Sequence, residues 1–219
     1  DMVGMVRAFI TDPEFALKAG EDRSEDIRAC IGCNQACIGH RQSGHGVSCI
    51  QFPETGREIE YGTLKPANAK KRIAVVGAGP GGMKAAIVAA KRGHDVTLYE
   101  KSSRLGGQVL LAQALPGRAE FGGLITNFEH ELRQHQVEIR KNALVTAATL
   151  LADRPDAVVI ATGAVPYQPP GEFDEAHVVT AWDVIENRAN VGKSVVIADW
   201  RCDWVGMGLA VVVLGPLAE

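Results

Sequence analysis

The central part of the chain alternates between short apolar runs and longer amphipathic stretches. Short apolar runs predict buried strands, and stretches with a period near 3.6 residues predict helices. The order strand, helix, strand predicts an α/β fold built on a parallel sheet. We predict buried strands at residues 72–76, 96–99, 156–161 and 194–199, and a shorter alternating strand at 137–140.

Two segments between these strands have the spacing of helices. Residues 83–92 follow the first strand, and residues 120–134 carry apolar side chains at helical intervals. The second segment therefore predicts an amphipathic helix. Its apolar positions are Phe121, Leu124, Ile125, Phe128 and Leu132.

The first residues predict half of a β/α unit. The apolar run from Met2 to Val6, followed by Arg7, predicts a strand within residues 1–10. Asp12 can cap a following helix, and Pro13 suits its first position. Such a strand cannot be buried alone and its partners are missing from this chain, so we expect a fragment or a processed product. A start at Asp1 supports that expectation.

Two other segments lack periodicity. Residues 40–71 contain several turn residues, and a long irregular segment of this kind is often functional or tethered. A second break, marked by Pro166, Pro169, Pro170 and Gly171, predicts a crossover between two units.

Composition narrows the classes of protein that fit. The 219 residues are 46% hydrophobic, which is enough for a proper core. A net charge of −3, 5% aromatic residues and the lack of a basic stripe argue against a nucleic-acid partner. The longest apolar run, near 205–214, is too short to cross a membrane, and no signal peptide is visible. We expect a cytoplasmic protein.

Four of the five cysteines lie close together with the spacing C-x2-C-x3-C-x11-C. They are Cys30, Cys33, Cys37 and Cys49. Three thiolates in one short loop can hold three corners of a cubane cluster, whereas a zinc site usually takes two separate C-x-x-C knuckles. The spacing favours an iron–sulfur cluster, with zinc, disulfides or free thiols as the alternatives.

A glycine-rich turn joins the first central strand to its helix. Gly77, Gly79 and Gly82 form the pattern G-x-G-x-x-G, and Pro80 within this turn is a further candidate cofactor-binding residue. The first glycine allows a tight turn, the second lets a pyrophosphate approach, and the third lets helix and strand pack closely. Glu100 ends the next strand, where a carboxylate can accept hydrogen bonds from a ribose. This context predicts a dinucleotide site.

Two further segments favour FAD over NAD at this site. Lys101 follows the carboxylate, and the pair Gly106-Gly107 with Gln108 suits a second close approach of backbone to a longer dinucleotide. An ordinary glycine turn is the alternative. The turn formed by Ala161, Thr162 and Gly163 ends another predicted strand and can pass close to the same cofactor.

The last predicted strand, 194–199, starts a second nucleotide-binding unit that lacks a phosphate-binding turn. Trp200 and Trp204 stand where close approach of a pyrophosphate would need small residues, and no glycine precedes Gly206. Cys202 in this turn is interpreted as a packed or incidental thiol.

Together these motifs resemble the iron–sulfur flavoproteins of the old yellow enzyme superfamily. That group includes trimethylamine and histamine dehydrogenases, N-demethylases and dienoyl-CoA reductases. The resemblance rests on the 3–7 and 12–14 segments, the Cys-Ile-Gly-Cys-Asn-Gln-Ala-Cys loop, the glycine turn, Glu100 with 106–108, and Ala-Thr-Gly at 161–163. It runs through nearly the whole chain.

The resemblance implies four parts. Residues 1–24 would end an FMN-binding (β/α)8 barrel, and residues 25–69 would form the cluster loop and linker. Residues 70–164 would bind FAD or ADP in a Rossmann-like fold, and residues 165–219 would hold the crossover and the incomplete second unit. Arg7 matches the barrel arginine that contacts the FMN phosphate, and the four clustered cysteines match the [4Fe–4S] ligands.

The resemblance also implies an oxidoreductase. The first hypothesis is amine oxidation at FMN, with electrons passing through the cluster to an electron-transferring flavoprotein. The second is an NADPH-dependent enoyl reductase of the dienoyl-CoA type, and the third is a non-catalytic electron-transfer or nucleotide-binding module. The barrel strands that would carry the catalytic acid are not in this chain, so catalytic residues stay unknown. A homo-oligomer is compatible with the sequence.

Overall fold

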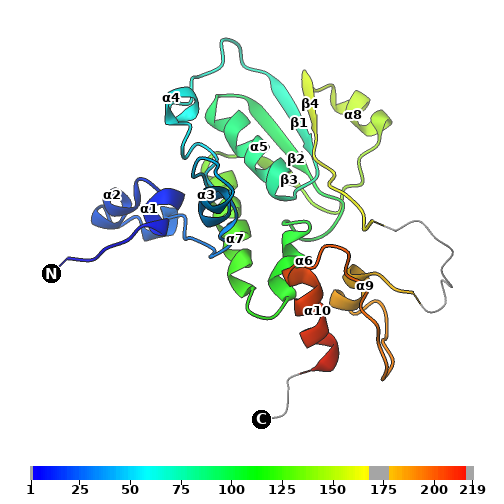
Figure 1. Cartoon of the computed structure of the whole chain (residues 1–219). Coiled ribbons are helices and arrows are strands. Elements are labelled where there is room, and N and C mark those ends of the chain that lie inside the picture. The colour runs from blue at the N-terminus through cyan, green and yellow to red at the C-terminus, as the bar shows by residue number, and fades with distance from the viewer. Residues whose placement is uncertain (1, 168–177, 216–219) are drawn as a thin grey trace.

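A parallel four-stranded sheet, in the order β3-β2-β1-β4, lies in the upper part of the molecule as drawn in Figure 1. The computed structural model describes residues 2–167 and 178–215, so the predicted crossover residues Pro169, Pro170 and Gly171 lie outside the described residues. The strands are β1 (Arg72–Val76), β2 (Asp95–Tyr99), β3 (Glu138–Arg140) and β4 (Ala157–Ile160). The α-helices are α1 (Arg7–Thr11), α2 (Phe15–Gly20), α3 (His40–Gln42), α4 (Glu58–Tyr61), α5 (Pro80–Lys91), α6 (Val109–Ala114), α7 (Gly122–Gln134), α8 (Ala147–Asp153), α9 (Ala181–Ile185) and α10 (Trp204–Leu214). Short 3-10 helices are η1 (Ser24–Asp26) and η3 (Ala119–Phe121), and η2 (Gln35–Gly39) is a π-helix.

The predicted core of the α/β unit is confirmed. Strand β1 pairs in parallel with β2 and with β4, as expected for strands joined by helical crossovers. Helix α5 lies against the sheet and against α7 (Figure 1). The apolar face predicted for 120–134 is buried in that core. Its side chains meet Met83 and Ile87 of α5 and Leu98 of β2 within one cluster.

The predicted N-terminal strand is wrong. Residues 2–5 have no regular structure, and Arg7 begins helix α1. Met2 and Val3 are exposed. A parallel strand needs hydrogen bonds from a neighbouring strand, and the described residues offer this segment none. The helix predicted after Asp12 is present as α2, which begins at Phe15, and the Asp12 side chain accepts a hydrogen bond from the Glu14 N–H (3.1 Å).

The predicted strand at 194–199 is also wrong. This segment is irregular, and the side chain of Val196 is 92% exposed. The strand predicted at 156–161 does form as β4, but it is not buried, since Ile160 is 68% exposed. Among the described residues β4 has a partner on one side only, which leaves an edge strand instead of an interior one.

A largely buried ion network, with Lys91 at its exposed end, joins the N-terminal helices to the sheet domain. Glu131 of α7 contacts Arg28 (2.9 Å) and Lys91 of α5 (2.7 Å). The Arg28 N–H and the Lys18 ammonium both donate to Asp12 (2.9 and 2.8 Å). Because an unpaired charge is costly inside a protein, each of these groups holds the next in place. The segment that precedes Cys30 is thereby fixed to α5 and α7.

A second contact ties the segment after Cys49 to helix α5. The Lys84 ammonium lies 3.2 Å from the Glu54 carboxylate, and both side chains are largely buried. The ring of Phe52 lies under the Arg28 guanidinium, 4.9 Å from its centroid. Burial lowers the pKa of Lys84, while the charge of Glu54 opposes this shift.

Candidate functional site

The glycine turn between β1 and α5 depends on two glycines that have no room for a side chain. Gly77 has a φ of +101°, and a Cβ there would overlap the carbonyl oxygen of Ala161. A Cβ on Gly82 would overlap the carbonyl oxygen of Gly77. The first and third glycines therefore let the turn, helix α5 and the end of β4 pack against one another.

Gly79 differs, because a Cβ there would meet no atom within 4 Å. Its backbone is extended (φ −70°, ψ 174°), and Pro80 is the first residue of the twelve-residue helix α5. The space beside Gly79 thus lies at the N-terminus of α5, where free N–H groups favour an anion. A pyrophosphate fits this position by charge and by the space available.

Two more glycine-containing segments face the same turn. Gly106 and Gly107 both have positive φ values (+120° and +52°), and a Cβ on Gly107 would lie 3.1 Å from the Gly79 Cα. The Gln108 side chain donates to the Ala164 carbonyl oxygen (3.4 Å), just after Gly163. The structure therefore brings the 77–82, 106–108 and 161–163 segments together.

The Glu100 carboxylate connects two of these segments. One oxygen accepts from the Ala78 N–H and the other from the Ser102 N–H, both at 2.9 Å. The residue is 9% exposed. Each carboxylate oxygen has a second lone pair, so a ribose hydroxyl could still donate to this group. Lys101 and Thr162 are exposed, and the half-buried Ala161 donates its N–H to the Val76 carbonyl oxygen (2.8 Å).

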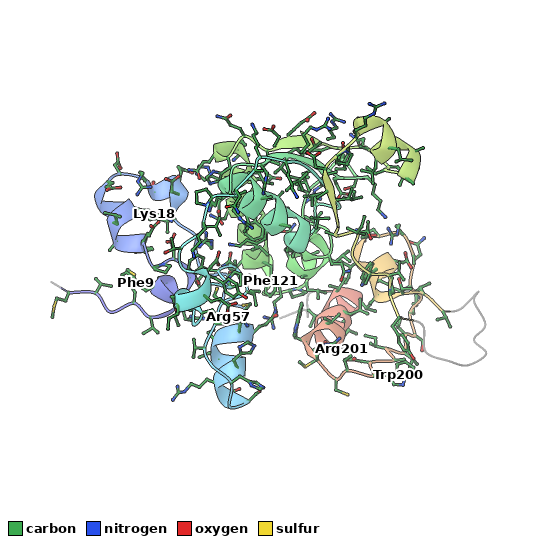
Figure 2. The ribbon with its side chains drawn as sticks, turned by 90° about the horizontal axis from the view of Figure 1, so that it is seen from above. Phe9, Lys18, Arg57, Phe121, Trp200 and Arg201 are labelled. Atoms are coloured by element: carbon green, nitrogen blue, oxygen red, sulfur yellow. The ribbon has the colours of Figure 1, made fainter. Side chains whose placement is uncertain are left out.

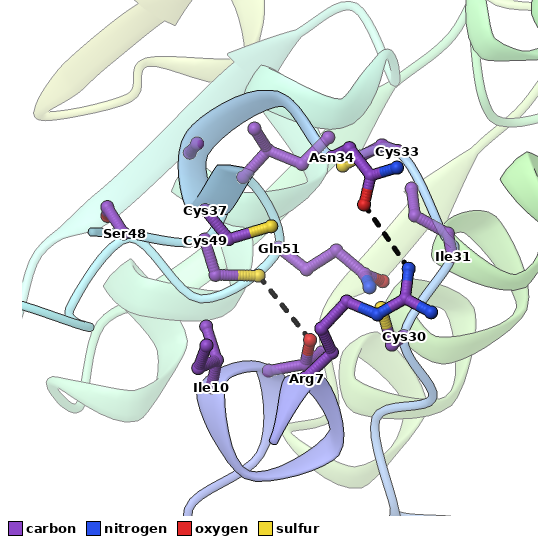
Figure 3. A pocket seen from close by; sticks show the side chains of 13 residues that line it. Arg7, Ile10, Cys30, Ile31, Cys33, Asn34, Cys37, Ser48, Cys49 and Gln51 are labelled. Carbon is purple, nitrogen blue, oxygen red and sulfur yellow. Dashed lines mark hydrogen bonds between the residues drawn. The ribbon is translucent and has the colours of Figure 1, made fainter. Parts of the chain in front are cut away.

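The four clustered cysteines line one pocket (Figure 3). Gly32 (φ +63°) and Asn34 (φ +55°) turn the backbone between Cys30 and Cys37, and the π-helix η2 carries Cys37. Cys49 enters from the returning segment, where the Ser48 N–H bonds to the Ala36 carbonyl oxygen (2.8 Å). Cysteines that are up to 19 positions apart in the sequence thus line the same pocket.

The thiols are close enough to influence one another. Burial raises the pKa of Cys33, and the charges of Cys49, Cys37 and Cys30 raise it further. All five cysteines of the chain are free thiols. Within residues 2–167 and 178–215, no three His, Cys, Asp or Glu side chains converge tightly enough for a single metal ion. Four soft ligands spread around one pocket fit a multi-iron cluster better than one zinc ion.

The sequence did not indicate that Thr11, Asn34 and Gln51 line this pocket. The Thr11 hydroxyl lies 3.7 Å from the Cys49 sulfur, and the Arg7 guanidinium donates to the Asn34 side chain (3.2 Å). Gln51 donates to the Ala29 carbonyl oxygen (2.9 Å), and its own buried side-chain oxygen meets no donor within residues 2–167 and 178–215. Arg7, predicted as an FMN-phosphate contact, lines the cysteine pocket in this structure.

The C-terminal turn packs against the domain in a way that the sequence did not indicate. The ring of Trp204 lies 5.8 Å from that of Phe121, with the Arg118 guanidinium over it at 4.6 Å. Trp200 and Arg201 lie at the outer edge of this region, and Cys202 is exposed (Figure 2). A Cβ on Gly206 would overlap the Asp199 carboxylate. No helix in the described parts of the chain is long and apolar enough to cross a membrane.

The parallel sheet, the glycine turn at the start of α5 and the adjoining segments define a dinucleotide-binding domain of the flavoprotein class, joined to a thiol-lined pocket. A family model described as pyridine nucleotide-disulphide oxidoreductase matches residues 71–198. The chain belongs to this family, in the group of iron–sulfur flavoproteins related to old yellow enzyme.

Two curated relatives illustrate the similarity. An NADH oxidase of Thermoanaerobacter brockii is 43% identical over 197 residues, which cover 88% of this chain and 30% of the relative. An N,N-dimethylglycine/sarcosine dehydrogenase of Chromohalobacter salexigens is 39% identical over 220 residues, which cover 96% and 32%. The chain thus spans about a third of the length of these relatives.

Solved structures share the fold over nearly the whole chain. A 2-naphthoyl-CoA reductase matches with a TM-score of 0.88 and 34% identity, covering 95% of this chain and 32% of the other. Histamine dehydrogenase from Rhizobium sp. 4-9 matches with a TM-score of 0.86 and 31% identity, covering 96% and 35%.

Proposed function

We propose that this chain is the dinucleotide-binding and cluster-bearing part of an oxidoreductase that oxidises a small amine. The observation that carries the redox function is the pocket of four thiols packed directly against the dinucleotide-binding domain. The amine is supported by similarity to a dimethylglycine/sarcosine dehydrogenase and to a histamine dehydrogenase, over nearly the whole chain.

In this proposal each part of the chain has a task. Residues 1–24 end the FMN-binding barrel, 25–69 hold the cluster, 70–164 bind FAD or ADP, and 165–219 begin a second unit. Cys30, Cys33, Cys37 and Cys49 ligate a [4Fe–4S] cluster, which supplies one-electron transfer when bound. Gly79 and the N-terminus of α5 receive the pyrophosphate, and Glu100 accepts from the ribose.

The electron acceptor is proposed to be an external electron-transferring flavoprotein. The 199–206 turn supports this choice, because Trp204 and Trp200 occupy positions where a phosphate-binding turn needs small residues. We place the protein in the cytoplasm.

A reductase is the second candidate. The 2-naphthoyl-CoA reductase and the NADH oxidase both match this chain over most of its length. In this case NADH or NADPH would be the electron donor and an enoyl-type compound the substrate. A non-catalytic electron-transfer module is the third candidate.

Anaerobic reduction distinguishes these candidates. The protein that carries this chain is purified with its cofactors and mixed with dimethylglycine, sarcosine and histamine, or with NADH and NADPH. We expect an amine to bleach the flavin absorbance, and the reduced nicotinamides to leave it unchanged. Bleaching by NADH or NADPH alone would favour the reductase. No bleaching by either donor, in a protein that holds iron and flavin, would favour the electron-transfer module.

Two glycine variants test the dinucleotide site. Gly79→Ala and Gly81→Ala each add a methyl group where no atom lies within 4 Å, so both should fold. Only the methyl at Gly79 would stand where the pyrophosphate is proposed to bind. We expect Gly79→Ala to lose at least about tenfold in affinity for ADP or FAD, about 1.4 kcal/mol, in calorimetric titration. Equal affinities for the two variants would remove the pyrophosphate from this position.

A further inference from the structure

Helix α1 presents one face to the cysteine pocket. Arg7, Ile10 and Thr11 all line it, and their spacing of three and four residues places them on the same side of a helix. Figure 3 shows Arg7 and Ile10 at one wall, opposite Cys37 and Asn34. Of the polar groups on this face, Thr11 is the most deeply buried, at 2% exposure.

The Thr11 hydroxyl lies beside a cysteine sulfur, and while Cys49 is a free thiol its S–H donates to the hydroxyl oxygen. Its oxygen lies 3.7 Å from the Cys49 sulfur, and no other hydrogen bond of this hydroxyl is present among the described residues. A cysteine that ligates iron has lost its proton and can only accept hydrogen bonds. The hydroxyl must then be the donor of this pair.

The position of Thr11 is fixed from the opposite side. Its carbonyl oxygen accepts from the Arg28 guanidinium (3.0 Å), which is itself held by Glu131. The next residue, Asp12, accepts from the Arg28 N–H and from the Lys18 ammonium. These contacts fix the backbone of Thr11, and its 2% exposure keeps the side chain away from solvent, so the hydroxyl is positioned beside the sulfur in advance.

We propose that Thr11 is a positioning residue that raises the reduction potential of the cluster by donating a hydrogen bond to the Cys49 thiolate. A donor to a ligand sulfur stabilises the reduced cluster more than the oxidised one, because the reduced form carries more negative charge. This inference rests on the proposed cluster at the four cysteines.

Thr11→Val tests the hydrogen bond with little change in shape, since it replaces the hydroxyl by a methyl group. Thr11→Ser keeps the donor. The matched control is Thr55→Val, because the Thr55 hydroxyl donates to the Ile10 carbonyl oxygen of the same helix (2.7 Å) and does not line the pocket. The measurement is the midpoint potential of the cluster, from a redox titration followed by electron paramagnetic resonance, with iron and sulfide assays on each protein.

We expect Thr11→Val to keep its iron and to shift the midpoint to lower potential. Thr11→Ser and Thr55→Val should stay near the wild-type value. An unchanged midpoint in Thr11→Val with full iron content would overturn the inference. If wild-type protein holds no iron and sulfide, the proposed cluster itself fails, and this outcome is distinct from the first.

A second measurement covers the case in which Thr11→Val does not hold the cluster. Electron–nuclear double resonance of the reduced cluster in wild-type protein should show a coupled proton. Its signal should disappear when the protein is exchanged into D2O. The same coupling should persist in Thr11→Ser and be absent in Thr11→Ala. A coupling that is unchanged in Thr11→Ala would assign the proton to another donor and overturn the inference.

Discussion

Glu131 shows how one residue can control the stability of the N-terminal part. Burial alone would raise the pKa of its carboxyl group, but Arg28 and Lys91 outweigh burial and hold the pKa at about 2. Each carboxylate oxygen has one cation to itself, Arg28 at 2.9 Å and Lys91 at 2.7 Å. Such an arrangement stabilises the folded chain only while the carboxylate is charged.

The sign of the pH dependence follows from this low pKa. The folded pKa of about 2 lies below the ordinary value of 4.5, so the contribution is complete above about pH 4.5 and is lost as the pH falls towards 2. We expect Glu131→Gln to lower the free energy of unfolding at pH 7 by on the order of 3 kcal/mol. Urea denaturation at pH 7 and pH 3 should show this difference shrinking at the lower pH.

Glu129→Gln is the matched control for that measurement. Glu129 lies on the same helix and meets Arg133 only at 4.0 Å on the surface. We expect a change below about 0.5 kcal/mol, as for other exposed pairs. A loss in Glu131→Gln that does not depend on pH would assign the effect to packing and not to charge.

At the scale of elements, the junction of β1 and α5 depends on a contact that tolerates no side chain. We expect Gly82→Ala to lower the free energy of unfolding by more than about 2 kcal/mol, because its Cβ would overlap the Gly77 carbonyl oxygen. Gly81→Ala, one position earlier in the same helix, should be neutral or stabilising by up to about 1 kcal/mol. Chemical denaturation followed by circular dichroism compares the two. Equal stabilities would show that the junction can shift to make room.

Elements defined by local patterns could be predicted from the sequence. The 120–134 segment has five apolar side chains at helical spacing, and all five are buried in the core. Four of them lie in α7, and the fifth, Phe121, is the residue just before this helix. Strand β1 and the glycine turn were equally clear, because the residues that fix them are neighbours in the chain. The same holds for the grouping of the four cysteines.

Elements that depend on distant partners were predicted less well. An apolar run such as 2–6 or 194–199 forms a strand only beside another strand, and the pattern does not reveal whether one is available. For the same reason, the sequence did not predict that Thr11, Asn34 and Gln51 line the cysteine pocket. A predicted strand gave no reason to place Thr11 on the face of Arg7, and only the fold brings Gln51 to Cys30.

At the scale of the whole molecule, ion pairs connect the segments around the thiol pocket to the dinucleotide domain. Arg28 and Lys84 bring the segments on both sides of the pocket to α7 and α5. A bound cluster stabilises the folded state because the unfolded chain cannot hold it in the same way. We therefore expect loss of the cluster to destabilise the dinucleotide domain as well.

Cys33→Ser tests this coupling. We expect it to lower the iron content strongly and to lower the midpoint of thermal unfolding by several degrees, in a single transition seen both by circular dichroism and by nucleotide fluorescence. Cys202→Ser, which changes an exposed thiol outside the pocket, should alter neither property. Two separate transitions in Cys33→Ser would show that the pocket and the domain unfold independently.

The two hydrogen bonds to Glu100 have a consequence for redesign of cofactor preference. In dinucleotide-binding folds, exchanging the carboxylate that meets the ribose is the usual route towards a phosphorylated nucleotide. Glu100, the carboxylate proposed to meet the ribose, also accepts hydrogen bonds from the Ala78 and Ser102 N–H groups, so the exchange would leave two backbone donors without this partner. A substitution of Glu100 would therefore change the nucleotide selectivity and the order of both loops at the same time. Most variants in a library that randomises Glu100 alone would have less ordered loops. A library that changes cofactor preference would have to vary residues 78 and 101–104 at the same time.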